Sequence, residues 1–181
     1  MPDAVATAFL AEARRRFAQY RQLAEDALAQ ADDAALFAAP GGEANALAIQ
    51  VKHLAGNFRS RWTDFLTSDG DKPDRQRDRE FELEPGDTRE ALMAAWAEGW
   101  RLLDVTLDGL GPDDLLRNVT IRGEPHRVLD TLSRALAHTA YHVGQIVLLV
   151  KQHAGADWRT LSIPRGQSET YAAEHRQRHA R

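Results

Sequence analysis

Apolar side chains recur at the spacing of an amphipathic α-helix through four long stretches of the chain, and this periodicity limits the fold more than any other feature. The predicted helices cover residues 3–30, 46–66, 88–109 and 128–153. Each helix would be apolar along one face, so it must bury that face against another element. Because there is little strand signal elsewhere, the sequence predicts an all-α fold, a four-helix bundle.

The connections between these helices predict their order. The first link is short, so the first two helices should be antiparallel neighbours, whereas the polar link of residues 67–87 is long enough to cross the length of a bundle. We therefore expect an up-down-down-up order, with a long crossover between the second and third helices. Residues 118–125 are rich in β-branched side chains and turn residues, which predicts a small hairpin-like excursion before the last helix. A single domain over residues 1–170 and a polar C-terminal tail over 171–181 complete the expected organisation.

The composition narrows the chemistry that such a bundle could carry. The chain has no cysteine, so a metal site would have to use histidine, aspartate, glutamate or water. Its net charge of −4 is spread over mixed signs, which gives no basic surface for a nucleic acid. No apolar run approaches the roughly 18 residues that a membrane span needs, and residues 1–4 carry no signal-peptide pattern. We expect a cytoplasmic protein with no nucleic-acid partner and no membrane partner.

Two histidines, His138 and His142, lie four residues apart within the apolar stretch 128–153. On an α-helix that spacing is about one turn, a rise of roughly 6 Å, so both imidazoles project from one face. A buried imidazole needs a partner, which could be a divalent metal or a hydrogen-bonding group, and the spacing alone favours neither. The same spacing occurs in metalloproteases, but those place a glutamate directly after the first histidine, where this chain has Thr139, so we set proteolysis aside.

A third histidine, His53, lies beside the apolar seam of the predicted helix 46–66, for which Asn45 would be a good N-cap. Taken alone, it is more typical of an ordinary packed histidine than of a metal ligand. The other four histidines of the chain receive no role, and three of them are expected at exposed positions (His126, His175 and His179; the fourth is His153).

Several segments together resemble the DinB/YfiT-like superfamily, and more closely its uncharacterised DUF1572 branch. They are Lys52-His53-Leu54-Ala55-Gly56-Asn57, the run His138-x-x-x-His142-Val143-Gly144-Gln145-Ile146, and residues 60–73 and 161–168. The resemblance covers about residues 5–170.

The resemblance implies a four-helix bundle with a three-histidine metal site, carried over onto His53, His138 and His142. It also implies that related bundles often form dimers, so we expect a homodimer. Some superfamily members are thiol-dependent transferases or isomerases that use bacillithiol or mycothiol. Others, this branch among them, have no known activity, so the metal site does not bring a reaction with it.

Three neutral imidazoles suit zinc or nickel, with iron, manganese and cobalt as alternatives. Three protein ligands leave at least one coordination position open, which is the pattern of a catalytic site and could hold water or a substrate thiolate. Other residues are candidates for a base, for bracing a metal ligand or for contacting a substrate: Gln50, Asn57, Asp64, Tyr141, Gln145 and Arg165. The alternative for Gln145 is a buried amide between helices, and the alternative for Arg165 is a salt bridge to the acidic residues of the 67–87 link.

Three functions stay open at this point. The first is a metal-dependent transferase or hydrolase that acts on a small-molecule thiol or electrophile. The second is a non-catalytic metal-binding or stress-response protein. The third is a dimerisation bundle whose histidines are ordinary core residues.

Overall fold

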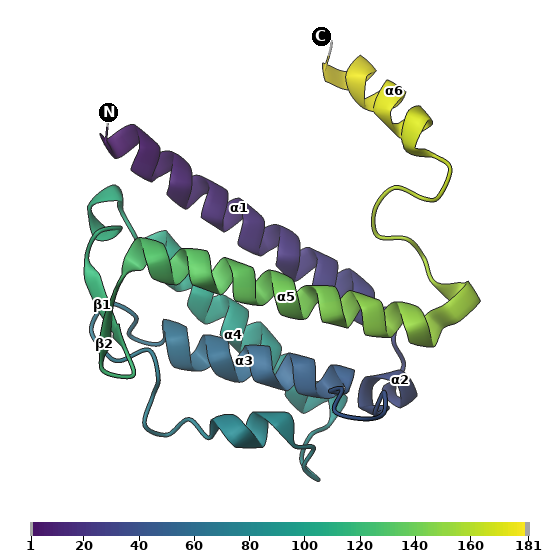
Figure 1. Ribbon diagram of the computed structural model, residues 1–181, viewed down its shortest axis with the longest axis horizontal. Helices are drawn as coiled ribbons and strands as arrows, with labels where there is room; N and C mark the ends of the chain where they lie inside the picture. The colour runs from purple at the N-terminus through teal and green to yellow at the C-terminus, as the bar shows by residue number, and fades with distance from the viewer. Residues whose placement is uncertain (1, 180–181) are drawn as a thin grey trace.

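The computed structural model describes residues 2–179, and over these residues the chain is mostly helical, with one small two-stranded sheet (Figure 1). The α-helices are α1 (Pro2–Leu28), α2 (Asp33–Phe37), α3 (Leu47–Trp62), α4 (Arg89–Gly109), α5 (Val128–Ala154) and α6 (Ser168–His179). The 3-10 helices are η1 (Arg77–Phe81), η2 (Pro112–Asp114) and η3 (Gly155–Asp157), and the strands are β1 (Asn118–Ile121) and β2 (Glu124–Arg127). None of the helices over these residues has both the length and the hydropathy that a membrane span requires.

The four longest helices pack together around one apolar core, with α3 against α4 and α1 against α5 (Figure 1). The core is rich in aromatic rings. Trp100 meets the ring of Phe58 edge-on at 4.8 Å and that of Trp96 at 5.6 Å, and Phe17 reaches Trp62 and Trp100 at 6.5 Å. Such edge-to-face pairs each add about 1 kcal/mol to the burial of the rings. These ring contacts join α3 to both α1 and α4, and so they hold α3 in place in the bundle.

Pairs of contacting residues give the relative directions of the helices. Gln50 contacts Gln145 and His53 contacts His138, so a step forward along α3 is matched by a step backward along α5. These two helices are antiparallel.

The other pairing of α3 has the opposite sense. Position 99 of α4 lies against Ala55, and Thr106 of α4 donates a hydrogen bond to the carbonyl oxygen of Trp62, so α3 and α4 are parallel. The link over residues 63–88 therefore runs back along the bundle, from the C-terminus of α3 to the level of its N-terminus, where α4 begins.

The sequence located the long helices well and the short elements less well. Helix α3 begins after Ala46, whose side chain makes no capping hydrogen bond, so the predicted cap at Asn45 is wrong. Helix α2 was not predicted; Asp32 caps it by accepting a hydrogen bond from the amide of Ala35. The predicted hairpin is present as β1 and β2, with Val119 opposite His126 in an antiparallel register.

Candidate metal centre

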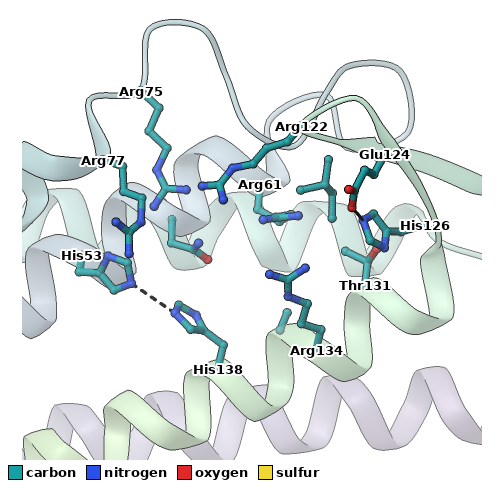
Figure 2. A pocket seen from close by; sticks show the side chains of 13 residues that line it. His53, Arg61, Arg75, Arg77, Arg122, Glu124, His126, Thr131, Arg134 and His138 are labelled. Carbon is teal, nitrogen blue, oxygen red and sulfur yellow. Dashed lines mark hydrogen bonds and ion pairs between the residues drawn. The ribbon is translucent and has the colours of Figure 1, made fainter.

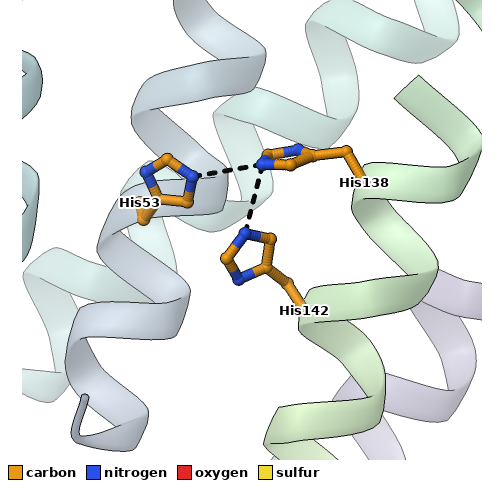
Figure 3. A group of neighbouring side chains, drawn as sticks. All are labelled: His53, His138 and His142. Carbon is orange, nitrogen blue, oxygen red and sulfur yellow. Dashed lines mark hydrogen bonds between the residues drawn. The ribbon is translucent and has the colours of Figure 1, made fainter. Parts of the chain in front are cut away.

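Three histidine rings meet in the space between α3 and α5 (Figure 3). His53 comes from α3, and His138 and His142 come from consecutive turns of α5. The Nε2 atom of His138 lies 3.2 Å from Nε2 of His53 and 3.1 Å from Nε2 of His142. One ligand atom from each residue lies within 4.8 Å of the others, which is close enough for one metal ion to be held by all three.

The outer nitrogen of two of these rings has a polar partner that fixes where the proton lies. His53 Nδ1 is 2.9 Å from a carboxylate oxygen of Glu80, which can only accept, so Nδ1 carries the proton and donates it. His142 Nδ1 is 2.7 Å from Oε1 of Gln50, whose amide nitrogen in turn donates to Oε1 of Gln145 at 2.9 Å. When these rings are neutral, each therefore directs an unprotonated Nε2 toward the centre of the cluster.

This arrangement fits a metal ion better than it fits hydrogen bonding among the rings alone. With the protons of His53 and His142 on Nδ1, a neutral His138 can supply at most one proton for three Nε2 atoms. At least one buried lone pair then faces another nitrogen without a proton between them, which is unfavourable. A zinc ion bound at about 2.05 Å in tetrahedral geometry would space its ligand nitrogens by about 3.3 Å, close to the two separations measured from Nε2 of His138.

Glu80 is the partner that sequence reasoning missed. It lies in η1, within the long polar link, and receives two hydrogen bonds of 2.8 Å from Arg75 in addition to the one from His53. Burial raises the pKa of the Glu80 carboxyl, but the hydrogen bonds from Arg75 and then from His53 outweigh burial and place that pKa below its usual value. Glu80 is thus an anion that holds the ring of His53, as the carboxylate partners of metal-ligating histidines do.

The two histidines of α5 are held in the neutral form. Burial, followed by the neighbouring His53 and nearby guanidinium groups, lowers the pKa of His138 to about 4. Burial and the other two rings lower the pKa of His142 to about 3. A metal ion binds the unprotonated imidazole, so at neutral pH it would meet no competing proton on either ring.

The cluster borders a cavity of about 410 Å³ (Figure 2). His53 and His138 form one end of it, and Asn57, one turn beyond His53 on α3, also lines it. The hairpin contributes His126, which is half-buried and not exposed as the sequence suggested. A small molecule in this cavity would lie directly beside the three imidazoles.

The structure brings some of the other candidate residues to the cluster and leaves others away from it. Gln50 is buried and holds His142, and the half-buried Gln145 in turn accepts a hydrogen bond from Gln50. Tyr141 is exposed, and its ring lies edge-to-face with the ring of His142, with 5.1 Å between the ring centroids. The remaining two candidates lie elsewhere and do not line the cavity: Asp64 in the turn after α3, and Arg165 in the exposed segment before α6.

The comparisons with known proteins give one match. A family model described as protein of unknown function (DUF1572) matches residues 4–167, which include the three histidines, Gln50 and Glu80. No curated protein and no solved structure matches the chain.

Proposed function

The chain belongs to the DUF1572 family, and we propose that it binds one divalent metal ion between His53, His138 and His142 as the centre of an enzyme. The observation that carries the proposal is the convergence of three Nε2 atoms, with Glu80 and Gln50 holding the opposite nitrogen of two of the rings. We also propose that the family is a branch of the DinB/YfiT-like superfamily, because the chain carries one histidine in α3 and two in α5.

Zinc and nickel are the metals we favour, with iron, manganese and cobalt as alternatives, because all the ligands are neutral nitrogens. When bound, such an ion would supply a Lewis acid that lowers the pKa of a water or thiol in its open position. The protein's part is to hold the ligands. Glu80 and Gln50 fix two of the rings, and Arg75 keeps Glu80 ionised and in place.

We propose a metal-dependent transferase or hydrolase that acts on a small-molecule thiol or electrophile. The cavity favours this function over metal storage, because His53 and His138 line a space large enough for a metabolite-sized molecule. A storage site would instead be closed on all sides by protein ligands. Activity would be sought by supplying the metal-loaded protein with a panel of thiols and electrophiles; no turnover on any pair, with metal bound, would leave only the non-catalytic function.

The metal site itself is tested by stripping the full-length protein of metal and titrating it with zinc or nickel. We expect one equivalent per chain and a rise in Tm, because a ligand of the folded state alone stabilises it by mass action. The triple variant His53→Gln, His138→Gln, His142→Gln should lose both effects, whereas His153→Gln, an exposed position on α5, should keep them. No metal above trace after reloading would refute the site.

The helix directions support the up-down-down-up order that we propose for the bundle. Helix α3 is antiparallel to α5 and parallel to α4, as their contacts indicate. Arg14 of α1 donates to the carbonyl oxygen of Leu107, and Trp96 donates to Glu25, so α1 is antiparallel to α4. These pairs support an order of α1 up, α3 and α4 down, and α5 up.

A further inference from the structure

Five arginine side chains from separate parts of the chain line the cavity beside the three histidines (Figure 2). Arg61 comes from the last turn of α3 and Arg134 from the first half of α5. Arg75 and Arg77 come from the link before α4, and Arg122 comes from the turn between β1 and β2. The same lining contains one carboxylate, that of Glu124, which contacts His126, so the guanidinium groups outnumber it and the cavity is suited to an anion.

Three of these arginines already have a carboxylate partner, and for Arg77 it is Asp78, at 3.6 Å. Arg75 makes its two short hydrogen bonds with Glu80 and a longer contact of 3.4 Å with Asp71. Arg122 donates to the other oxygen of Asp71 at 2.8 Å. These three guanidinium groups line the cavity, but each already contacts a carboxylate of the protein.

Arg61 and Arg134 are not balanced in this way. Among the described residues, neither side chain makes a hydrogen bond or an ion pair. Burial, and then the positive charges of Arg134 and Arg75, lower the pKa of Arg61 to about 10, and the carboxylate of Asp71 opposes this shift only in part. Two unpaired guanidinium groups facing one cavity repel each other, and an anion between them would remove that cost.

Their positions place such an anion at a definite distance from the histidines. Arg61 follows His53 by eight residues on α3, a rise of about 12 Å, and Arg134 precedes His138 by four residues on α5, a rise of about 6 Å. Because α3 and α5 are antiparallel, both steps lead in the same direction along the cavity. An anion held by both arginines would therefore lie one to two helical turns from the three imidazoles.

We propose that the cavity binds a small molecule through a doubly charged oxyanion, a phosphate or a pair of carboxylates, held between Arg61 and Arg134. Two unpaired positive charges match a dianion, and the planar guanidinium group binds either kind of oxygen pair through two parallel hydrogen bonds. The far end of the molecule then faces His53 and His138, which line the same cavity. That second half of the inference rests on the proposed function, whereas anion binding by the arginines does not.

The test is calorimetric titration of the full-length, metal-free protein, after dialysis to remove the chelator, with inorganic phosphate, succinate, acetate and glycerol. We expect phosphate or succinate to bind, acetate to bind more weakly and glycerol not at all. The double variant Arg61→Gln, Arg134→Gln should bind the tighter dianion at least about tenfold more weakly, as expected for the loss of charge-assisted hydrogen bonds. Arg15→Gln, Arg101→Gln removes the same charge from exposed helix positions and should bind almost as the unmodified chain does.

The outcomes separate the sources of the anion. Preferential binding of phosphate identifies a phosphorylated ligand, and preferential binding of succinate identifies a dicarboxylate. Arg134→Gln alone replaces an exposed side chain, so it should keep the Tm of the unmodified protein and still weaken binding. No binding of either dianion, or an equal loss in the Arg15→Gln, Arg101→Gln control, would overturn the inference.

Because the titration uses metal-free protein, the two proposals fail separately. A protein that takes up metal but no dianion loses this inference and keeps its metal site. A protein that binds the dianion but never a metal loses the proposed function and keeps the anion site.

Discussion

Glu80 occupies the space that a side chain at Gly56 would fill. A Cβ atom at position 56 would lie 2.5 Å from the Oε1 atom of Glu80 and 2.8 Å from its carboxyl carbon. The carboxylate that holds His53 can approach α3 only because residue 56, one turn along the same helix, has no side chain. A glycine in the middle of a helix costs about 0.5–1 kcal/mol of stability relative to alanine. At this position the glycine leaves room for the Glu80 carboxylate to reach His53.

Gly56→Ala should therefore weaken metal binding without unfolding the protein. The new methyl group pushes Glu80 away from His53, and loss of such a partner lowers metal affinity by about tenfold or more. Zinc titration of the purified variant measures the change. Gly144→Ala is the matched control, because position 144 is exposed on α5 and a Cβ atom there meets nothing within 4 Å. Equal metal affinities for the two variants would contradict the role assigned to Glu80.

Glu80→Gln should lower metal affinity about 10- to 100-fold, the range typical for loss of a carboxylate behind a ligating histidine. The amide can still accept from His53 but carries no charge, and it leaves the guanidinium of Arg75 without its main ion pair. We also expect a lower Tm for the metal-free protein, since a buried charge loses its partner. Glu82→Gln, two residues away and exposed, should change neither quantity; a similar loss there would point to a general charge effect.

The stability of the metal-free protein should fall as the pH drops below about 6.5. The folded protein holds the pKa of His138 at about 4 and that of His142 at about 3, against an ordinary value of 6.5 in the unfolded chain. Between these values the unfolded chain binds more protons, so the free energy of unfolding decreases as pH falls. Urea unfolding at pH 7, 6 and 5 measures the slope. The double variant His138→Gln, His142→Gln should show a shallower one, and an unchanged slope would mean that these rings are not held neutral.

Gly99→Ala should destabilise the protein by about 1–3 kcal/mol, the usual cost of overpacking a close helix contact. A Cβ atom at position 99 of α4 would lie 3.1 Å from the Cβ atom of Phe58 and 3.4 Å from the backbone of Ala55. Thermal or urea unfolding compares this variant with Gly144→Ala, which should be slightly stabilising because alanine favours the helix. If both variants gain stability, α3 and α4 can separate more easily than their contacts suggest.

The parts of the candidate site that the sequence could predict depend on local geometry. His138 and His142 lie four apart on a strongly periodic helix, so their shared face follows from the helical repeat. The helical spacing of Trp96 and Trp100 is likewise typical of core residues, and both side chains are buried. The expected homodimer, cytoplasmic location and thiol chemistry depend on properties that these contacts do not test, and they stay predictions.

By itself, the sequence determined the long helices, the pairing of the two histidines on α5 and the absence of thiolate ligands, because each follows from composition or from spacing along one helix. The family resemblance implied that His53 joins the other two rings, but only the tertiary structure brought them together, placed Glu80 behind His53 and set Arg61 and Arg134 at one cavity. These residues are far apart in the chain, and no spacing rule relates them. Their meeting depends on how α3 and α5 pack and on the path of the polar link, which are set by contacts throughout the core.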